Sequence, residues 1–356
     1  MTKRHRACDV AIIGLGLAGA TLAWRVHGAG LSVLIIDDAD ASAASRVAAG
    51  LVTPVTGARL KPQPRYSELA DIARDHYERV AELTGARTYF ERAAVRLLGK
   101  QRELDAFAAM ETSGEVLLGP LDAALPDGIR SAGVPVIMPA AARLAMVEYV
   151  DATRRYFAGH GNVICATVSD ASVTAAANHV EIPSLCVTAG AAVFCRGHRE
   201  SNNAHFKALR WRAAKGQVLE LDCPGFDRRF TIHGEGIWLT ATSGTRVLAG
   251  ATYECDELDT TVTTAARNKL VTAVDSILAL AYSIVDQRAA VRPIVEGRMP
   301  VLGQSGTSER IWLMNGLGSK GALFAPTIAR HLVSAMTAGN AIPEAFSLAH
   351  RVGMSS

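Results

Sequence analysis

The clearest chemical pattern in the sequence is a set of three glycines followed by an acid. Gly14, Gly16 and Gly19 form a G-x-G-x-x-G turn, and Asp37 follows at the spacing of roughly 20 residues that is typical of nucleotide-binding folds. The first glycine permits a tight bend, the second lets the backbone approach a pyrophosphate, and the third allows a helix and a strand to pack closely. The acid is placed to accept hydrogen bonds from a ribose diol. The pattern therefore predicts a dinucleotide site.

The segments around these glycines supply the elements that such a site needs. Residues 10–13 are a short apolar run typical of a buried parallel strand, residues 20–30 are predicted to be helical, and residues 32–36 form a second apolar run. The N terminus of the helix would offer free N–H groups and a partial positive charge to phosphates. Residues 9–24 also fit a secretory signal peptide, but the second strand and the acid favour the dinucleotide site.

The acid also narrows the choice of nucleotide. The pair Asp37-Asp38 argues against NADP, whose 2′-phosphate calls for arginine at this place. The glycine motif alone leaves both FAD and NAD open. The stretch 45–60, rich in small residues, predicts a close-packed loop or an irregular helix start where a simple NAD domain would continue with alternating units.

A second glycine-rich turn lies near the other end of the chain. Residues 311–314 are predicted to form a strand, residues 315–321 read NGLGSKG, and a helix is expected to follow. A helix N terminus at this place would stabilise negative charge on the pyrimidine end of a flavin. The alternative is an ordinary strand–turn–helix unit in which the glycines serve packing alone.

Taken in order, these segments resemble the FAD-dependent oxidoreductases of the D-amino-acid oxidase and glycine oxidase superfamily, and above all bacterial members of it. The resemblance extends over nearly the whole chain. The segments that carry it are the first glycine turn with Asp37, SRVAAGLVTPVTG (45–57), KGQVLEL (215–221), VLAGATYE (247–254), VRPIVEGRMPVLG (291–303) and NGLGSKG (315–321).

The resemblance implies FAD as the cofactor and assigns residues to it. The first turn would hold the pyrophosphate, Asp37 would hold the adenosine ribose, and the backbone of Val168, expected in a strand, would contact the adenine. The second turn would close over the flavin pyrimidine. The full set of expected cofactor residues is Gly14, Gly16, Leu17, Ala18, Gly19, Asp37, Asp38, Ser45, Arg46, Ala48, Ala49, Gly50, Val168, Gly316, Leu317, Gly318, Ser319, Lys320 and Gly321.

The resemblance also points to residues that would act on the substrate. Arg292 matches the family arginine that pairs with a substrate carboxylate, although a structural ion pair is the alternative. Tyr253 could offer a hydroxyl to the substrate or be a packed aromatic, and Lys320 could act on the flavin or on oxygen. Arg298 is expected to be a solvated loop charge. The region 195–206 is expected to be a polar loop, although its two histidines suggest catalysis as well.

The family fold implies an α/β architecture of two interleaved domains. A Rossmann-like FAD-binding domain would comprise residues 1–60, 145–200 and 290–356, and an α+β domain with an antiparallel sheet for the substrate would comprise 61–144 and 201–289. The local patterns agree. Residues 66–85 predict an amphipathic helix with Ser67 as its N-cap, residues 205–255 predict antiparallel strands, and residues 259–285 predict another helix.

The composition gives no indication of several classes of function. The net charge of +3 gives no argument for nucleic acid or an anionic membrane, and no apolar run reaches the roughly 18 residues of a membrane span. The 6 cysteines form no metal-ligand pattern, so we expect no metal site and a reducing, cytoplasmic location. The partner is expected to be a small-molecule substrate, and a homo-oligomer is compatible with the sequence.

These observations lead to one expected function and two alternatives. The resemblance implies oxidation of the C–N bond of a small amino acid or amine by hydride transfer to flavin N5, giving an imine that hydrolyses, with O₂ as the oxidant. A 2-hydroxy acid dehydrogenase that uses an electron carrier is one alternative. A flavin-fold protein that has lost catalysis and acts in a complex is the other, and Gly297, where relatives often have an acid, keeps it open.

Overall fold

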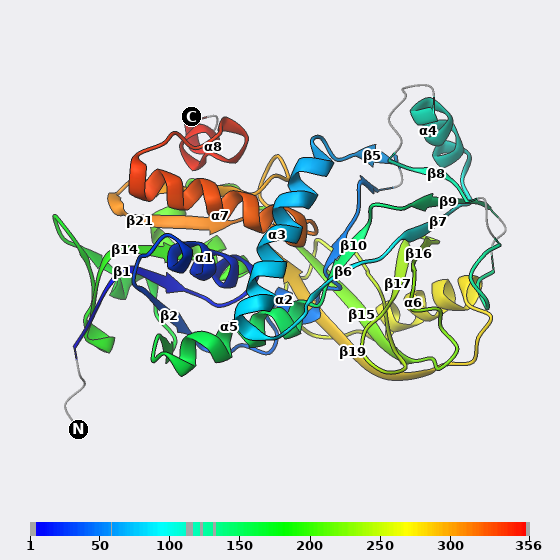
Figure 1. Cartoon of the computed structure of the whole chain (residues 1–356), viewed down its shortest axis with the longest axis horizontal. Coiled ribbons are helices and arrows are strands. Elements are labelled where there is room, and N and C mark those ends of the chain that lie inside the picture. Colours follow the sequence, from blue (N-terminus) through cyan, green and yellow to red (C-terminus); the bar gives the residue numbers. More distant parts are fainter. Residues whose placement is uncertain (1–4, 58, 112–116, 122–123, 131–132, 354–356) are drawn as a thin grey trace.

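The computed structural model describes residues 5–57, 59–111, 117–121, 124–130 and 133–353. Two large sheets organise this part of the chain, and they lie at opposite ends of the longest axis (Figure 1). The first sheet has the order β11-β2-β1-β14-β13-β12, with β21 paired to β14 and β20 to β21. Its strands are β1 (Arg6–Ile13), β2 (Val33–Asp37), β11 (Val163–Cys165), β12 (Thr174–Ala175), β13 (Val180–Ile182), β14 (Val187–Phe194), β20 (Val301–Ser305) and β21 (Ser308–Asn315).

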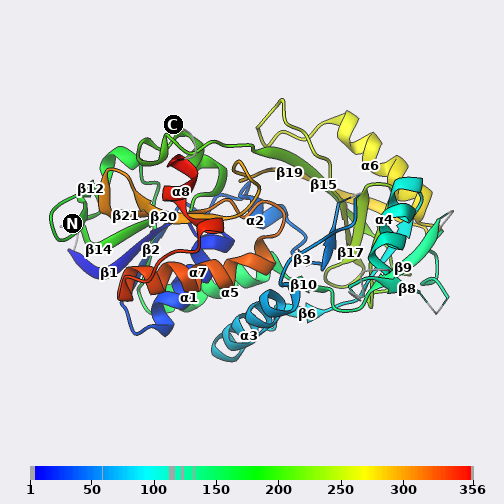
Figure 2. The ribbon, with the colours of Figure 1, turned by 90° about the horizontal axis from the view of Figure 1, so that it is seen from above.

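The centre of this sheet is parallel and buried on both faces. β2, β1, β14 and β21 pair in parallel, and their apolar runs pack into a core on each side. Helices α1 (Leu17–Gly28), α5 (Met146–Gly159) and α7 (Gly321–Ala338) cover one of these faces, and α3 (Tyr66–Thr84) packs on α5 and α7 (Figure 2). This arrangement is the Rossmann-like unit that the N-terminal pattern predicts.

The second large sheet is mostly antiparallel, and the helix α6 (Thr264–Ile277) packs on one of its faces through Leu270 and Val274. Its strand order is β19-β15-β18-β17-β16-β7-β9-β8. The strands are β7 (Ala94–Leu98), β8 (Gly119–Pro120), β9 (Val134–Met138), β15 (Ala214–Asp222), β16 (Thr231–Gly234), β17 (Ile237–Ala241), β18 (Arg246–Gly250) and β19 (Ser283–Arg292).

Small elements connect the two sheets. A three-stranded sheet, β3-β10-β6, lies between them (Figure 2). The remaining strands and helices are β3 (Leu51–Val52), β4 (Val55–Thr56), β5 (Lys61–Pro62), β6 (Tyr89–Glu91), β10 (Ala142–Leu144), α2 (Ala44–Val47), α4 (Gln101–Glu111) and α8 (Leu348–Gly353), with the 3-10 helices η1 (Asp170–Ser172), η2 (Pro183–Leu185), η3 (Gly197–Asn202), η4 (Ala204–Phe206) and η5 (Glu344–Phe346). The fold is thus the predicted α/β two-domain type, and the exact domain boundaries stay a prediction.

Several local predictions need correction. The helix expected over residues 259–285 ends at Ile277, and the long strand β19 begins at Ser283, because pairing with β15 takes over from the helical pattern. Ser67 lies inside α3, whose N-cap is Arg65 in a left-handed conformation. The strand expected to contain Val168 ends at Cys165. No helix of the described residues is long and apolar enough to span a membrane.

Candidate active site

The first glycine turn folds as the sequence predicts. Gly14 has a φ of +103°, which favours glycine, and a Cβ on Gly19 would lie 1.9 Å from the carbonyl oxygen of Gly14. Close packing of α1 on β1 therefore requires glycine at this position. The N-cap residue of α1 is Gly16, which has no side chain to cap the helix. Instead, the Leu17 N–H donates to the hydroxyl of Ser45 at 2.8 Å.

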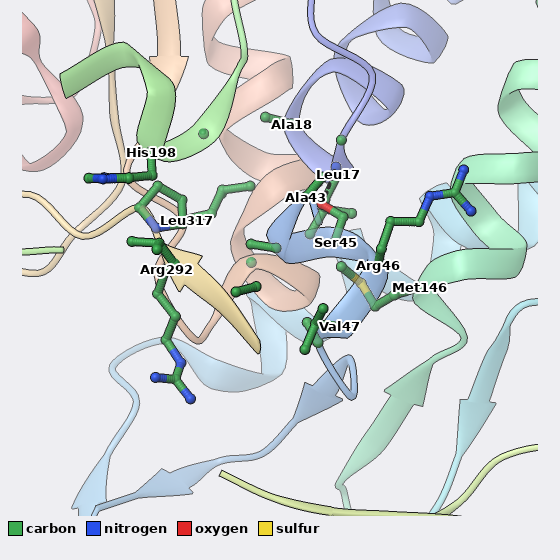
Figure 3. A pocket seen from close by; sticks show the side chains of 18 of the residues that line it. Leu17, Ala18, Ala43, Ser45, Arg46, Val47, Met146, His198, Arg292 and Leu317 are labelled. Atoms are coloured by element: carbon green, nitrogen blue, oxygen red, sulfur yellow. Dashed lines mark hydrogen bonds between the residues drawn. The ribbon is translucent and has the colours of Figure 1, made fainter. Parts of the chain in front are cut away.

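A cavity of about 330 Å³ lies at this helix terminus. Figure 3 shows it between the α1 terminus, the α2 segment, His198 and Arg292. Most of the predicted cofactor residues line it: Gly14, Gly16, Leu17, Ala18, Asp37, Ser45, Arg46, Ala48, Ala49, Gly50, Leu317, Gly318, Ser319 and Gly321. The remaining predicted residues lie outside the lining that the described part of the chain defines: Gly19, Asp38, Val168, Gly316, Lys320 and Tyr253.

Asp37 is the buried acid at one end of the cavity. One of its oxygens accepts the Leu15 N–H at 2.7 Å, and the other accepts the Ala39 N–H at 2.9 Å and a guanidinium N–H of Arg154. The acid thus fixes the glycine turn as well as facing the cavity. Arg154, from α5, is a site residue that the sequence analysis missed, because nothing local links it to a residue so far away in the chain.

The neighbouring acid, Asp38, is engaged by the polar loop instead. Both of its carboxylate oxygens accept from Arg199, at 2.6 and 3.0 Å, and this pairing lowers the pKa of Asp38. Arg196 forms a two-point ion pair with the buried Glu200 and donates to the carbonyl of Val168 at 2.7 Å. The Val168 carbonyl is therefore engaged within the protein, and its predicted contact with adenine stays a prediction.

The polar loop supplies part of the cavity wall, which the sequence analysis did not expect. Gly197, His198 and Arg199, in η3, line the cavity, whereas His205 lies outside its lining. The ring Nδ1 of His198 is buried and has no hydrogen-bond partner among the described residues, and burial lowers the pKa of this histidine. The sequence signal for this placement is that the loop follows the apolar segment 191–195; that its strand, β14, lies next to β1 is known only from the structure.

The second glycine turn follows β21 and precedes α7, as predicted. Gly316 and Gly318 have φ angles of +72° and +53°, and the Asn315 amide donates to the Gly197 carbonyl at 3.0 Å, joining the turn to the polar loop. The Lys320 ammonium donates to the side-chain carbonyl of Gln63 at 2.9 Å. Burial, and then repulsion from Lys61, lower the pKa of Lys320.

Arg292, at the end of β19, stands on the cavity wall. Its guanidinium donates to the backbone carbonyls of Lys215 at 3.2 Å and Thr252 at 3.1 Å, and it forms no ion pair within the described residues. A Cβ on Gly216 would lie 2.2 Å from it, so glycine there makes room for the guanidinium. Tyr253 is 51% exposed, and the Arg292 guanidinium lies 5.6 Å from the centre of its ring.

These features fit FAD. The α1 terminus, where Ser45 accepts the Leu17 N–H, and the glycine at position 16, whose Cβ would lie 3.0 Å from the Ser45 hydroxyl, bring the backbone to the cavity in a way that suits a pyrophosphate. Asp37 and the second turn, through Leu317, Gly318 and Ser319, line the same cavity, and their contacts with the cofactor stay predictions. Within the described residues, no group of three or more His, Cys, Asp or Glu side chains could hold a metal ion.

The comparisons with known proteins agree with this class of site. The family model "FAD dependent oxidoreductase" (DAO) matches residues 9–335, so the chain belongs to this family of FAD-dependent oxidoreductases. In fold, the chain is similar to iminodiacetate oxidase from Chelativorans sp. BNC1, with a TM-score of 0.78, 22% identity and coverage of 94% of this chain and 96% of that one. It is also similar to glycine oxidase from Bacillus cereus, with a TM-score of 0.79, 20% identity and the same coverage.

The curated relatives of the chain are named for tRNA modification, whereas the similar structures are named as oxidases of small amines. The chain is 29% identical over 354 residues to the tRNA 5-methylaminomethyl-2-thiouridine biosynthesis bifunctional protein MnmC of Caulobacter vibrioides, covering 93% of this chain and 54% of that protein. The corresponding protein of Maricaulis maris is 27% identical, with 93% and 52% covered. The chain thus spans about half the length of the curated relatives it matches.

Proposed function

We propose that this FAD-dependent oxidoreductase oxidises the C–N bond of a small amine or amino acid that carries a carboxylate. The observation that carries the proposal is Arg292, a cation on the cavity wall whose guanidinium donates to two backbone carbonyls and is paired with no carboxylate of the described chain. Planar guanidinium groups bind carboxylates in a two-point geometry. A substrate carboxylate therefore completes the pairing that the protein itself leaves open.

The residues around Arg292 would orient the substrate and exclude water. Trp238, Ala251 and Leu258 give this part of the cavity an apolar wall, which strengthens the ion pair by removing competing solvent. The carboxylate on Arg292 would fix which carbon–hydrogen bond faces the cofactor. Bound FAD supplies the hydride acceptor; the substrate loses a hydride from the carbon beside nitrogen and a proton from nitrogen, and the resulting imine hydrolyses.

The names of the similar proteins support this substrate class. Glycine and iminodiacetate, named in two of the similar structures, are both small amines that carry carboxylates. The curated relatives are named for the biosynthesis of 5-methylaminomethyl-2-thiouridine in tRNA, so an amine attached to RNA is a second candidate substrate. We propose O₂ as the oxidant of the reduced enzyme, with an electron carrier as the alternative.

The proposal is tested by the visible spectrum of the holoprotein under anaerobic conditions. Amines and amino acids with a carboxylate should bleach the flavin bands, and 2-hydroxy acids should not. Admitting oxygen should then restore the bands and form hydrogen peroxide. Bleaching by 2-hydroxy acids alone would overturn the C–N assignment, and bands that no compound bleaches would favour a protein that has lost catalysis.

Replacing the arginine tests the role assigned to it. Arg292→Ala should lower kcat/KM for a carboxylated amine by about 100-fold, since charge-assisted hydrogen bonds contribute roughly 1.5–3 kcal/mol each. The kcat/KM of Arg292→Lys should lie between those of the unchanged protein and Arg292→Ala, because lysine keeps the charge and loses the two-point geometry. Arg102→Ala, at an exposed position on α4, is the control. Equal kinetics in all variants would contradict the carboxylate role.

A further inference from the structure

We propose that three arginines beside the cavity form a second anion site, which binds a phosphate or carboxylate group of the substrate away from the amine. Arg92, Arg143 and Arg228 make up this arginine cluster. The identity of the ligand as substrate rests on the proposed function; the anion site itself rests on the geometry of the three side chains. Nothing in the proposed reaction at Arg292 uses them.

Arg143 is the centre of the argument because it is buried without a partner. Its exposed fraction is 5%, and its Nε atom is buried with no hydrogen-bond partner among the described residues. Its guanidinium forms no ion pair there either, although ion pairs are common elsewhere in the chain. An unpaired buried charge costs several kcal/mol of folding free energy. A bound oxyanion would supply the missing partner.

The other two arginines lie around it. The Arg92 backbone N–H donates to the Ala141 carbonyl at 3.0 Å, next to the strand β10 that carries Arg143. Its guanidinium donates to the hydroxyl of Thr240 at 3.1 Å and to the Ala241 carbonyl at 2.6 Å. Arg228 donates to the carbonyl of Thr242 at 2.6 Å, and Thr242 directly follows Ala241, the last residue of β17. Backbone carbonyls and a hydroxyl thus fix two guanidinium groups and leave their charges unneutralised.

Strand register places the cluster on the cavity side. Arg143 is directly opposite Leu51 in the antiparallel pair β10–β3, so the two side chains project from the same face, and Leu51 lines the cavity. Thr240, which binds Arg92, lies two residues after the cavity residue Trp238 on β17 and shares its face. The sheet β3-β10-β6 lies between the two large sheets (Figure 2). None of the three arginines is among the described residues that line the cavity, but Arg143 and Thr240 share strand faces with the lining residues Leu51 and Trp238.

The electrostatics of the cluster also favour an anion. Burial, and then repulsion from Arg92, lower the pKa of Arg143 to about 10, so the guanidinium remains a cation at neutral pH. Burial and then repulsion from Arg228 lower the pKa of Arg92 as well. Glu148 is the acid whose field acts on Arg143; it is exposed, and it forms no ion pair within the described residues. The cluster therefore keeps an excess of positive charge.

The shape of the donor set identifies the ligand chemistry as an oxyanion with several acceptor oxygens. Guanidinium groups match phosphate and carboxylate geometry, and the three of this cluster lie near enough to repel one another, which suits a phosphate or the far carboxylate of a diacid. Two sources have this chemistry: the phosphodiester backbone of a nucleic acid and a small dicarboxylate. In either case, the substrate carries two anionic groups, one for Arg292 and one for the arginine cluster.

The first test measures binding and needs no turnover. Inorganic phosphate is titrated into the holoprotein by calorimetry, and Arg143→Gln and Arg92→Gln should each raise its Kd by about 10- to 100-fold. Arg229→Gln, which removes an 80% exposed arginine next to Arg228, is the matched control and should leave the Kd unchanged. FAD content of each variant reports folding, and Arg92→Gln serves if Arg143→Gln does not fold. The same Kd in all variants overturns the site.

The second test separates the two sources. Glutarate and an unmodified single-stranded oligoribonucleotide are used as competitors of phosphate. Displacement by glutarate alone indicates a small diacid as substrate, and displacement by the oligoribonucleotide alone, weakening steeply with salt, indicates RNA. Displacement by neither overturns the assignment of the site to the substrate.

The failure of this inference is distinguishable from the failure of the proposed function. Arg292→Ala should lose oxidation of carboxylated amines and keep phosphate binding. If no amine is oxidised, phosphate binding still tests the arginine cluster. If amines are oxidised and Arg143→Gln changes neither phosphate binding nor the KM of any doubly anionic amine, the cluster has no ligand role and the proposed function stands.

Discussion

At the scale of single residues, the same side chain often serves the fold and the site together. Asp37 is expected to hold a ribose, and it also receives the Leu15 N–H and the Arg154 guanidinium. Arg292 is held by two backbone carbonyls, which fix its direction without neutralising its charge. A residue with this kind of support can present one functional group in a fixed place, as substrate binding requires.

Gly216 offers a test of that support. Gly216→Ala should displace the Arg292 guanidinium, because the new Cβ would lie 2.2 Å from one of its nitrogens and the flexible end of the arginine would move first. We expect kcat/KM for a carboxylated amine to fall by about 10-fold, with FAD content unchanged. Steady-state kinetics with Gly159→Ala as control, a position with open space around it, checks this. Unchanged kinetics would show that the position of Arg292 is not critical.

At the scale of elements, the junction between β1 and α1 carries the cofactor site. The strand ends at Ile13, the turn follows, and the helix starts at Leu17 with its N terminus on the cavity. The helix is buried along most of its length, against α5 and α7 as well as the sheet. Packing therefore fixes the position of α1, and it also fixes the position of the glycine turn that joins α1 to β1.

Two substitutions in the same helix separate packing from propensity. Gly19→Ala should lower the free energy of unfolding by on the order of 3 kcal/mol and reduce FAD content, because its Cβ would lie 1.9 Å from a backbone oxygen that cannot move away. Gly28→Ala meets no atom within 4 Å and should raise stability by up to about 1 kcal/mol, since alanine favours a helix over glycine. Chemical denaturation measures both, and equal effects would refute the close-packing argument.

At the scale of the whole molecule, segments far apart in the chain share one core. Tyr77 of α3 donates to the Ala322 carbonyl of α7, and His76 pairs with the Tyr149 hydroxyl of α5 at 2.9 Å. The cavity likewise takes its walls from both large sheets. Loss of one buried contact should therefore lower the free energy of unfolding of the whole molecule.

His76 makes this coupling visible as a pH dependence. Burial, and then repulsion from Arg25, lower the pKa of His76 from 6.5 to about 3. Between these values, the unfolded chain binds a proton that the folded chain does not, so stability is full above pH 6.5 and falls as pH is lowered toward 3. The contribution is about 1.4 kcal/mol per pH unit. His76→Gln should lower this slope by the contribution of one histidine and leave that of His233, whose pKa burial also lowers to about 3. His160→Gln, at an exposed position, should leave the slope unchanged, and equal slopes in the two variants would contradict the assignment.

The sequence alone determined the parts of this protein that depend on local patterns. Gly14, Gly16, Gly19 and Asp37 predict a strand–turn–helix unit because each has a local steric or hydrogen-bonding reason for its type. The same holds for the turn at 315–321. The order of such segments carried the resemblance to the FAD-dependent oxidoreductases, which the family match confirms.

Only the tertiary structure decided which distant residues meet these patterns. Arg154 reaches Asp37 from α5, the polar loop after β14 forms one wall of the cavity, and Arg143 of β10 is paired in register with the cavity residue Leu51. The long strand β19 replaced part of an expected helix because pairing with β15 overrides a helical pattern that has no partner face. Contacts of this kind depend on sheet order and register, and one-dimensional spacing does not encode them.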